Sequence, residues 1–361
     1  MKITIKTTQF QDLVARAIKC SSNDKLIPIT SLMKIRFDGG RLHLTTTDAT
    51  NYLTVSAQVE DKGTLDVVVM ADNFAKLISK MTCENITLDF TDNNLTVIGG
   101  RSQYKLELPL DVDGQLVELD VPYDIAISDV EPEYVSMGAI NTMVNTAKSA
   151  LATSLDTPCY TAYYVGDTIL STDSYKICCI NDKLFAEPVL LSANTVDLLQ
   201  LLPGADETEI GYYRDGDTLA FRTENNILYT KAYEGIGSYS VDAIMGFVSS
   251  DFTNDCVVRK DELLQSLDRL ALFVGDYDRN VILMSFGNGE LVLQNKKSAG
   301  TETIECLSGS KEEFSCAIDI EMLKSQVKVN TVDDVEIQYG LNNCIKMVDG
   351  SVTQIIALVN V

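Results

Sequence analysis

The chain alternates between helix-like and strand-like hydrophobic patterns in a fixed order. In residues 71–81 the apolar side chains recur at the spacing of one helix face, which predicts an amphipathic helix. These side chains are Phe74, Leu77, Ile78 and Met81. Period-two alternation then predicts strands at 85–90, 95–98 and 104–108. This part of the chain therefore reads as one helix followed by antiparallel strands.

The same order returns in the middle and last thirds of the chain. The predicted helices are 194–202 and 320–329. The predicted strands are 207–212, 218–221 and 227–231 in the middle third, and 335–339, 344–347 and 353–358 in the last third.

The front half of each third also repeats, with a short strand, an amphipathic helix and two further strands. The helix faces are Phe10, Leu13, Val14, Ala17 and Ile18; then Ile140, Met143, Val144, Ala147 and Leu151; then Leu263, Leu267 and Leu270. The strand pairs are 33–37 with 41–45, 161–165 with 168–171, and 281–286 with 290–294.

Corresponding positions lie roughly 120 residues apart, which is the signature of an internal repeat. The 361 residues accordingly divide into three predicted domains, 1–122, 123–245 and 246–361. Each domain is predicted to be an α+β unit of two helices packed on antiparallel strands.

The charge balance narrows the classes of function. The chain has 52 acidic and 29 basic residues and a net charge of −23. This excludes a surface that holds nucleic acid by bulk charge, although a local basic patch remains possible. The nine cysteines are odd in number and include no C-x-x-C pair, so we expect reduced, mostly buried thiols in a cytoplasmic protein. Neither a signal peptide nor a membrane-spanning run is found.

Catalytic chemistry finds little support in the sequence. The single histidine, His43, lies between Leu42 and Leu44 in an alternating strand, which favours a structural role. One histidine also excludes a metal site built on two of them, and neither a phosphate-binding loop nor a nucleophile elbow occurs. An acidic α+β hydrolase that uses His43 remains the enzymatic alternative.

Three motifs, in order along the repeat, carry a family resemblance. They are Leu42-His-Leu-Thr-Thr-Thr-Asp48, Gly99-Gly-Arg-Ser-Gln-Tyr-Lys-Leu106 and Leu170-Ser-Thr-Asp-Ser-Tyr-Lys-Ile177. With the threefold repeat, they resemble the bacterial-type DNA sliding clamps, the beta subunit family of DNA polymerase III. The resemblance implies the DNA clamp fold, with helices lining the hole of a ring, and a polymerase processivity factor without enzymatic activity, cofactor or metal.

Some positions depart from the family pattern. Ser174-Tyr175-Lys176 stands where Gly-His-Arg is usual, and the C-terminus lacks the usual Pro-Met ending. These departures fit a divergent clamp, such as a phage-encoded one.

A clamp attracts phosphates without reading bases, so basic side chains are expected on one face of the helices. Lys76 and Lys80 lie opposite the apolar face of their helix, and Lys324 and Lys328 recur at the corresponding places. The full set of expected DNA-facing residues is Arg16, Lys19, Lys76, Lys80, Lys148, Lys260, Arg269, Lys324 and Lys328.

By resemblance, the ring closes as a homodimer through one strand of the first domain and one edge of the third. The implied interface residues are Arg101, Tyr104, Lys105, Leu106, Leu272, Phe273, Glu302 and Glu305.

By resemblance again, an apolar pocket between the second and third domains binds short peptides of polymerases and other replication proteins. Its residues come from the second Thr-Asp turn, the following linker, the last helix and the C-terminal strand. They are Thr172, Ser174, Tyr175, Lys176, Ile177, Ser240, Ile244, Met245, Met322, Ile355, Ala357 and Val359.

The implied partners are double-stranded DNA bound without sequence preference, a DNA polymerase, an ATP-driven clamp loader and a second copy of the chain. The middle domain is poor in basic helix residues, because Asp197 and Leu201 stand where the other domains have lysines. A repeat scaffold that binds proteins without encircling DNA is therefore the alternative.

Overall fold

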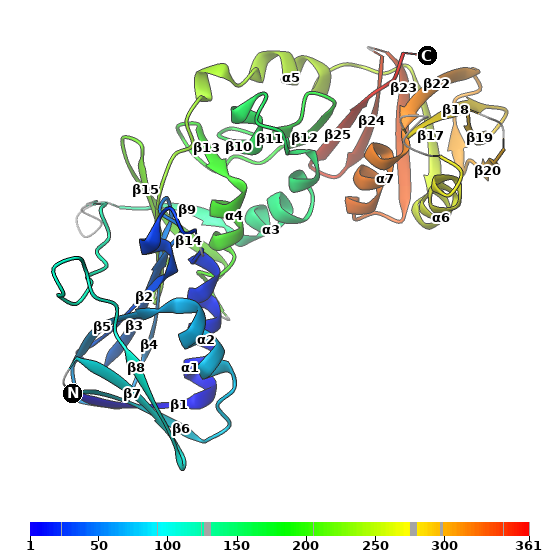
Figure 1. Ribbon diagram of the computed structural model, residues 1–361. Coiled ribbons are helices and arrows are strands. Elements are labelled where there is room, and N and C mark those ends of the chain that lie inside the picture. Colours follow the sequence, from blue (N-terminus) through cyan, green and yellow to red (C-terminus); the bar gives the residue numbers. More distant parts are fainter. Residues whose placement is uncertain are drawn as a thin grey trace. The chain divides into compact units, whose positions relative to one another are not determined.

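The computed structural model describes residues 1–360 apart from 23, 92, 124, 126–130, 205, 275–279, 297–298 and 342. The chain forms two compact units, each with its own sheets and helices (Figure 1). Unit 1 contains Met1–Gly138 and Asn194–Ala232, and unit 2 contains Ala139–Ala193 and Tyr233–Val361.

The largest element of unit 1 is an eight-stranded antiparallel sheet in the order β5-β2-β3-β4-β16-β15-β14-β9. Its strands are β5 (Leu65–Met70), β2 (Leu32–Asp38), β3 (Arg41–Thr47), β4 (Tyr52–Gln58), β16 (Ile227–Lys231), β15 (Thr218–Arg222), β14 (Glu209–Asp215) and β9 (Glu133–Ser136). The first four strands belong to the first sequence repeat and the last four to the second. The sheet is joined across the two repeats where Tyr52 of β4 pairs with Tyr229 of β16.

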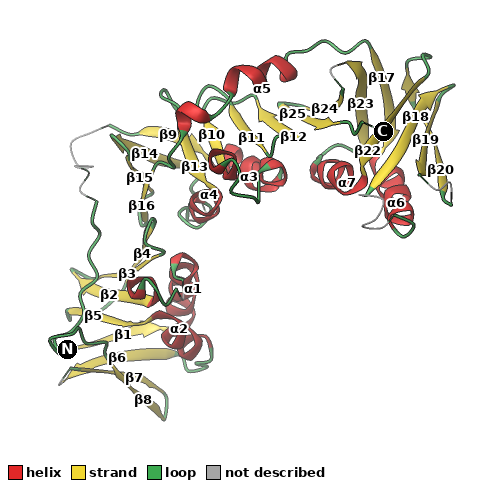
Figure 2. Ribbon diagram, turned by 45° about the horizontal axis from the view of Figure 1, so that its top comes forward, coloured by secondary structure: helices red, strands yellow, loops and turns green. Residues whose placement is uncertain are grey.

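A second, four-stranded sheet of unit 1 has the order β1-β6-β7-β8. Its strands are β1 (Lys2–Lys6), β6 (Asn85–Thr91), β7 (Asn94–Gly99) and β8 (Ser102–Glu107). Helices α1 (Thr7–Ala17) and α2 (Ala71–Ser79) lie side by side on the strands (Figure 2). Their buried faces meet at Phe10 and Phe74, whose rings pack edge to face with centroids 5.9 Å apart.

Unit 2 contains a nine-stranded sheet in the order β13-β10-β11-β12-β25-β24-β23-β17-β21. Its strands are β13 (Val189–Ser192), β10 (Ala162–Val165), β11 (Ile169–Thr172), β12 (Lys176–Ile180), β25 (Val352–Ala357), β24 (Cys344–Asp349), β23 (Asp334–Leu341), β17 (Asn254–Arg259) and β21 (Ser308–Gly309). Its β12–β25 seam joins the second repeat to the third, as the β4–β16 seam of unit 1 joins the first to the second.

The other sheet of unit 2 has the order β20-β19-β18-β22, and helices α6 (Lys260–Ala271) and α7 (Ile320–Val329) contact each other beside it. Its strands are β20 (Thr301–Glu305), β19 (Glu290–Asn295), β18 (Val281–Gly287) and β22 (Phe314–Asp319). The core between them is formed by fully buried aliphatic side chains, among them Leu263, Leu267 and Leu323.

The remaining helices differ most from the sequence prediction. Helix α4 (Ala193–Leu199) is one of the expected helices, whereas α3 (Met137–Asn145) ends early and continues as the 3₁₀ turn η4 (Ala147–Ala150). Helix α5 (Val241–Val248) is a helix that the sequence pattern did not predict. The segment is helical because Val241, Ile244, Met245 and Val248 share one face, which packs against the core beside β10 and β11.

The α+β class, with helices on antiparallel sheets, is thus confirmed. The three-domain division stays a prediction, because both large sheets combine strands of neighbouring repeats and the compact units therefore divide the middle repeat.

None of the described helices is long and apolar enough to cross a membrane. All nine cysteines are free thiols, and six of them are buried. Burial raises the pKa of the Cys20 thiol to about 12, so this group stays protonated near neutral pH.

Candidate functional site

The second Thr-Asp turn joins β11 to β12 and carries four of the predicted pocket residues. The Asp173 carboxylate accepts hydrogen bonds from the backbone N–H groups of Tyr175 at 2.9 Å and Lys176 at 2.7 Å. The Thr172 hydroxyl accepts from the N–H of Ser174 at 3.0 Å. Ser174 has a φ of 78°, in the left-handed region that favours glycine. The turn is therefore held by its own side chains despite that strained position.

Lys176 is bound inside the protein. Its side chain is only 13% exposed, and its ammonium lies 3.3 Å from the Asp173 carboxylate. It also donates to the carbonyl of Ser149 in η4 at 2.6 Å. The Ser149 hydroxyl in turn accepts from Gln326 of α7 at 2.9 Å, and Gln354 of β25 donates to Gln326 at 3.1 Å. Lys176 thus belongs to a polar network that fixes the turn against η4.

The apolar floor of the predicted pocket lies on the β12–β25 seam. Ile177 pairs with Ile355 across the two strands, and the N–H of Ala357 donates to the carbonyl of Tyr175 at 2.8 Å. Ile244 and Met245 of α5 pack in the same cluster as Ile177, and Ser240 is the exposed residue just before that helix. The Tyr175 side chain is 62% exposed beside this floor. These residues, taken from three separate parts of the sequence, are brought together.

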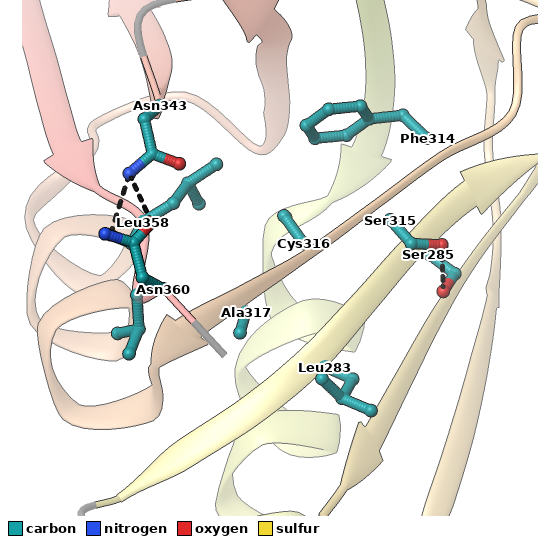
Figure 3. A pocket seen from close by; sticks show the side chains of 10 residues that line it. Leu283, Ser285, Phe314, Ser315, Cys316, Ala317, Asn343, Leu358 and Asn360 are labelled. Atoms are coloured by element: carbon teal, nitrogen blue, oxygen red, sulfur yellow. Dashed lines mark hydrogen bonds between the residues drawn. The ribbon is translucent and has the colours of Figure 1, made fainter.

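Two predicted pocket residues lie elsewhere in unit 2. Met322 packs against the core beside α6 and α7. Val359 lines a hollow of about 490 Å³ between β18, β22 and the C-terminal segment, where its N–H donates to the carbonyl of Ala317 at 2.8 Å (Figure 3). The hollow is lined by Leu283, Ser285, Phe314, Ser315, Cys316, Ala317, Asn343, Leu358, Val359 and Asn360.

The walls of this hollow combine apolar and hydrogen-bonding groups. Asn343 donates to the Leu358 carbonyl and the Asn360 side chain, both at 3.4 Å, and so steadies the end of the chain. Sequence reasoning found only Val359 here. The strand alternation of β18 and β22 shows which residues share a face, but nothing in it shows that the C-terminal segment lies opposite.

Four of the expected DNA-facing cations are bound to groups in other elements of the protein. Arg16 donates to the Leu201 carbonyl at 2.5 Å, and Lys260 donates to the Asn330 carbonyl. Lys324 lies 2.5 Å from the carboxylate of Asp268. The fourth, Arg269, forms two hydrogen bonds to Glu302, at 2.8 and 2.6 Å.

The Arg269 pair joins residues for which the sequence implied different roles, one facing DNA and one in the dimer interface. The hydrogen bonds from Arg269 lower the pKa of the Glu302 carboxyl, so the carboxylate stays charged and paired. Arg269 and Glu302 of unit 2 therefore form one ion pair.

The remaining expected cations are exposed on the helices or at their ends. Lys19 and Lys76 line a shallow hollow of about 340 Å³ between α1 and α2, whose floor includes Val14 and Ile18. Lys76 also lies 2.6 Å from the carboxylate of Asp72, one turn earlier on the helix. Lys80, Lys148 and Lys328 are likewise exposed.

The described helices carry as many acidic as basic side chains. The net charge of −23 therefore comes from the rest of the chain. Helices without net charge repel phosphates less than the acidic strands and loops do.

The expected interface strands are both sheet edges. Strand β8, with Tyr104, Lys105 and Leu106, ends the sheet of unit 1, and β20 ends a sheet of unit 2. Beyond α6, Leu272 is 81% exposed and Phe273 is 54% exposed. Arg101 is exposed at the turn before β8, and Glu305 is exposed on β20. Open edges beside exposed apolar side chains are typical of surfaces that pair with another chain.

His43 lies on β3, directly across from Arg36 of β2. Burial, followed by the charges of Arg41 and Arg36, lowers the pKa of the imidazole, so it is neutral near pH 7. Among the described residues, no group of three His, Cys, Asp or Glu side chains is arranged to hold a metal ion.

Comparisons with known proteins show which family the chain resembles. A family model described as the N-terminal domain of the DNA polymerase III beta subunit matches residues 1–113. The beta sliding clamp of Lactococcus lactis is 21% identical over 366 residues, covering 95% of this chain and 93% of the relative. That of Bacillus subtilis is 21% identical, covering 79% of this chain and 78% of the relative.

Solved structures agree over the whole chain. The beta subunit from the DNA polymerase of Streptococcus pyogenes has a TM-score of 0.87 at 16% identity and covers 100% of both chains. The sliding clamp of Bacillus subtilis has a TM-score of 0.86 at 16% identity, covering 100% of this chain and 99% of that one.

The fold is therefore that of the DNA sliding clamps. The resemblance to the bacterial-type clamps of the DNA polymerase III beta subunit family is confirmed, at low sequence identity.

Proposed function

We propose that the chain is a DNA polymerase processivity factor, a sliding clamp that encircles duplex DNA and tethers a polymerase. The observation that carries this proposal is the match of the full chain to clamp structures, at a TM-score of 0.86 with 100% of this chain covered. Tethering raises the effective concentration of the polymerase at the primer end, so a clamp needs no catalytic step of its own.

Double-stranded DNA would be held without base recognition. Lys19, just beyond α1, and the exposed lysines of α2, η4 and α7 support a surface that contacts phosphates, together with the low net charge of the helices. Weak, sequence-independent contacts allow sliding.

The ring would close as a homodimer in which β8 of one chain pairs with β20 of the other. Two such contacts related by a twofold axis use every interface edge and leave none open. Leu272 and Phe273 support this assignment, because two large apolar side chains are exposed together there.

Polymerases and other partners would dock on the β12–β25 seam, where Tyr175 is exposed above Ile177 and Ile355. The hollow at Val359 would extend this surface along the C-terminal segment. An ATP-driven clamp loader would open the ring, and the protein would work in the cytoplasm.

The test measures the mass of the assembly in solution and its retention on circular and on cut DNA. Light scattering across a concentration series should give a species of twice the 39.7 kDa chain mass. That species, once loaded, should be retained on circular DNA and lost after the circle is cut. A monomer at all micromolar concentrations, or equal retention on both forms, contradicts the proposal.

A scaffold that binds proteins only is the second candidate. It is favoured by one observation, the internal pairing of Arg16, Lys260, Arg269 and Lys324. A scaffold would bind partner peptides but show no dependence on DNA topology.

A further inference from the structure

The eight strands of the large sheet in unit 1 correspond in order to the first eight of the nine in unit 2, so each position at the first seam has a counterpart at the second. The order β5-β2-β3-β4-β16-β15-β14-β9 in unit 1 corresponds to β13-β10-β11-β12-β25-β24-β23-β17 in unit 2. Tyr52 pairs with Tyr229 at the first seam, as Ile177 pairs with Ile355 at the second. The floor of the proposed peptide pocket therefore has a counterpart in unit 1.

The turns beside the two seams also match. Asp48 accepts from the N–H groups of Thr50 at 2.9 Å and Asn51 at 2.7 Å, as Asp173 does in the second turn. Ala49 has a φ of 82°, and its counterpart Ser174 has a φ of 78°. Thr50 thus corresponds to Tyr175, the exposed residue of the proposed pocket.

At the first seam this place is filled by the chain itself. The Tyr123 ring packs edge to face on Tyr52 with centroids 5.5 Å apart, and its hydroxyl donates to the Thr50 carbonyl at 3.0 Å. The ammonium of Lys231 lies 5.8 Å from the centroid of the same ring. Tyr123 therefore occupies, in unit 1, the position that a peptide side chain would take beside Tyr175 in unit 2.

Residues 117–123, which we call the strap, pack on the sheet through the apolar side chains of Val117, Leu119, Val121 and Tyr123. Leu119 is 1% exposed and packs with Leu32, Tyr52 and Val68. Asp120 lies 3.3 Å from Lys34, but its side chain is 76% exposed, so this ion pair adds little. Hollows of about 410 and 430 Å³ flank the strap between it and the sheet. A segment that is held on the sheet by its side chains and flanked by open space can open locally.

We propose that the β4–β16 seam is a second peptide-binding site, closed in this structure by Leu119 and Tyr123 of the strap. The ligand would be an extended peptide of the strap's own chemistry, with a leucine, an acidic residue and, four positions after the leucine, a tyrosine. The tyrosine is selected over phenylalanine because the Thr50 carbonyl accepts its hydroxyl. The kind of protein that would carry this peptide rests on the proposed function. Peptide binding at the site can be tested independently of that function.

The probe is a fluorescent synthetic peptide of residues 117–123, titrated into the full-length protein. Three variants are compared with the natural chain: a strap-release variant (Leu119→Ser with Tyr123→Ser), a variant blocked at the second seam (Tyr175→Ala with Ile177→Asp), and their combination. Val112→Ser is the matched control, because this nearby side chain is fully exposed.

The natural chain should bind one peptide per chain, the strap-release variant two, the blocked variant none and the combined variant one. On the combined variant, a peptide with phenylalanine in place of tyrosine should bind about fivefold more weakly, as expected for one lost hydrogen bond.

A strap-release variant that binds no more peptide than the natural chain overturns the inference. If the natural chain binds none but strap release adds one, the second-seam pocket fails while the first-seam site stands. Tyr123→Ser alone, which leaves Leu119 in place, serves as the opening variant if the double substitution unfolds. It should bind the peptide in the blocked background, and failure to do so counts against the site.

Discussion

The third residue of each Thr-Asp turn has a left-handed backbone although it is not glycine. Ala49 has a φ of 82° and Ser174 a φ of 78°. A Cβ atom is unfavourable in this region, whereas glycine enters it freely. The turns persist because the Asp48 and Asp173 carboxylates each accept two backbone N–H groups.

Relieving this strain should stabilise the protein. We expect Ala49→Gly to raise the free energy of unfolding by about 0.5–1 kcal/mol, measured by urea denaturation. Ala15→Gly removes the same methyl group from the exposed face of α1 and should lower it by about 1 kcal/mol. Equal losses in both variants would show that the left-handed residue stores no strain.

Asp61 should contribute a pH-dependent part of the stability. Its carboxylate accepts from the N–H of Gly63 at 3.0 Å, Thr4 at 3.0 Å and Lys62 at 2.6 Å, and these bonds, that of Gly63 first, lower its pKa. A lowered pKa in the folded state means that the contribution is present above the ordinary value of 3.8 and is lost as the pH falls through the lower folded value.

We therefore expect Asp61→Asn to be less stable than the natural chain at pH 7 and to lose less stability on acidification. Chemical denaturation at a series of pH values between 7 and 3 measures both. Parallel curves for the two proteins would rule out this role for Asp61.

Single-residue roles were only partly predictable from the sequence. The exposure of Tyr175 follows from its place in a turn. The bonding of Lys176 to Ser149, and of Arg16 to Leu201, joins residues far apart in the chain, and helical spacing carries no signal for it. The strap anchor Tyr123 was missed for the same reason, because its partners Tyr52 and Thr50 lie in an earlier hairpin.

At the scale of the elements, hydrophobic periodicity predicted those helices whose bounds are set by their own buried face. Helix α7 (Ile320–Val329) has the predicted bounds, because four buried side chains recur on one face and Asp319 caps its start. Helix α5 was missed because its short apolar run reads equally as a buried linker. Which strands are edges was not readable from the sequence, since it depends on the pairing of the whole sheet.

The edge beside α6 gives a prediction about assembly. Leu272 is 81% exposed, so Leu272→Asp leaves the core of unit 2 intact. In a dimer it would bury a charge, and we expect the dimer dissociation constant to rise by about two orders of magnitude. Light scattering over a dilution series measures the change, and thermal unfolding should show an unchanged fold.

Leu155→Asp is the matched control for this prediction, because Leu155 is 73% exposed and belongs to the second repeat, whereas the proposed interface uses the first and third. Equal effects of the two substitutions would exclude Leu272 from the interface.

At the scale of the whole molecule, the distribution of charge can distinguish a clamp from a protein scaffold. The net charge is −23, whereas the helices carry as many basic as acidic side chains. We expect Lys19→Glu, Lys76→Glu and Lys80→Glu together to weaken retention on circular DNA and to reduce its dependence on salt. Retention measured at several salt concentrations tests this.

Lys62→Glu, Arg222→Glu and Lys311→Glu together are the control, because these three cations are exposed outside the helices and their reversal changes the net charge by the same amount. A scaffold would respond to neither set, and equal losses in both would show that only the total charge matters.

The threefold repeat and the α+β class were readable from the sequence because each repeat keeps its own hydrophobic pattern. The sharing of sheets between repeats was not, because strand order beyond neighbouring hairpins depends on long-range pairing.

Because the sheets are shared, the repeats of the sequence do not coincide with the compact units of the folded chain. The middle repeat supplies β16 and β12, but their partners β4 and β25 belong to its two neighbours. A fragment that contained only the middle repeat would expose an unpaired edge strand on both of its sheets and would be prone to aggregate. A duplication that created such a chain could persist only if the new copies completed one another's sheets. Loss of one repeat would leave both neighbours incomplete, so a divergent chain can change its surfaces far more easily than its number of repeats.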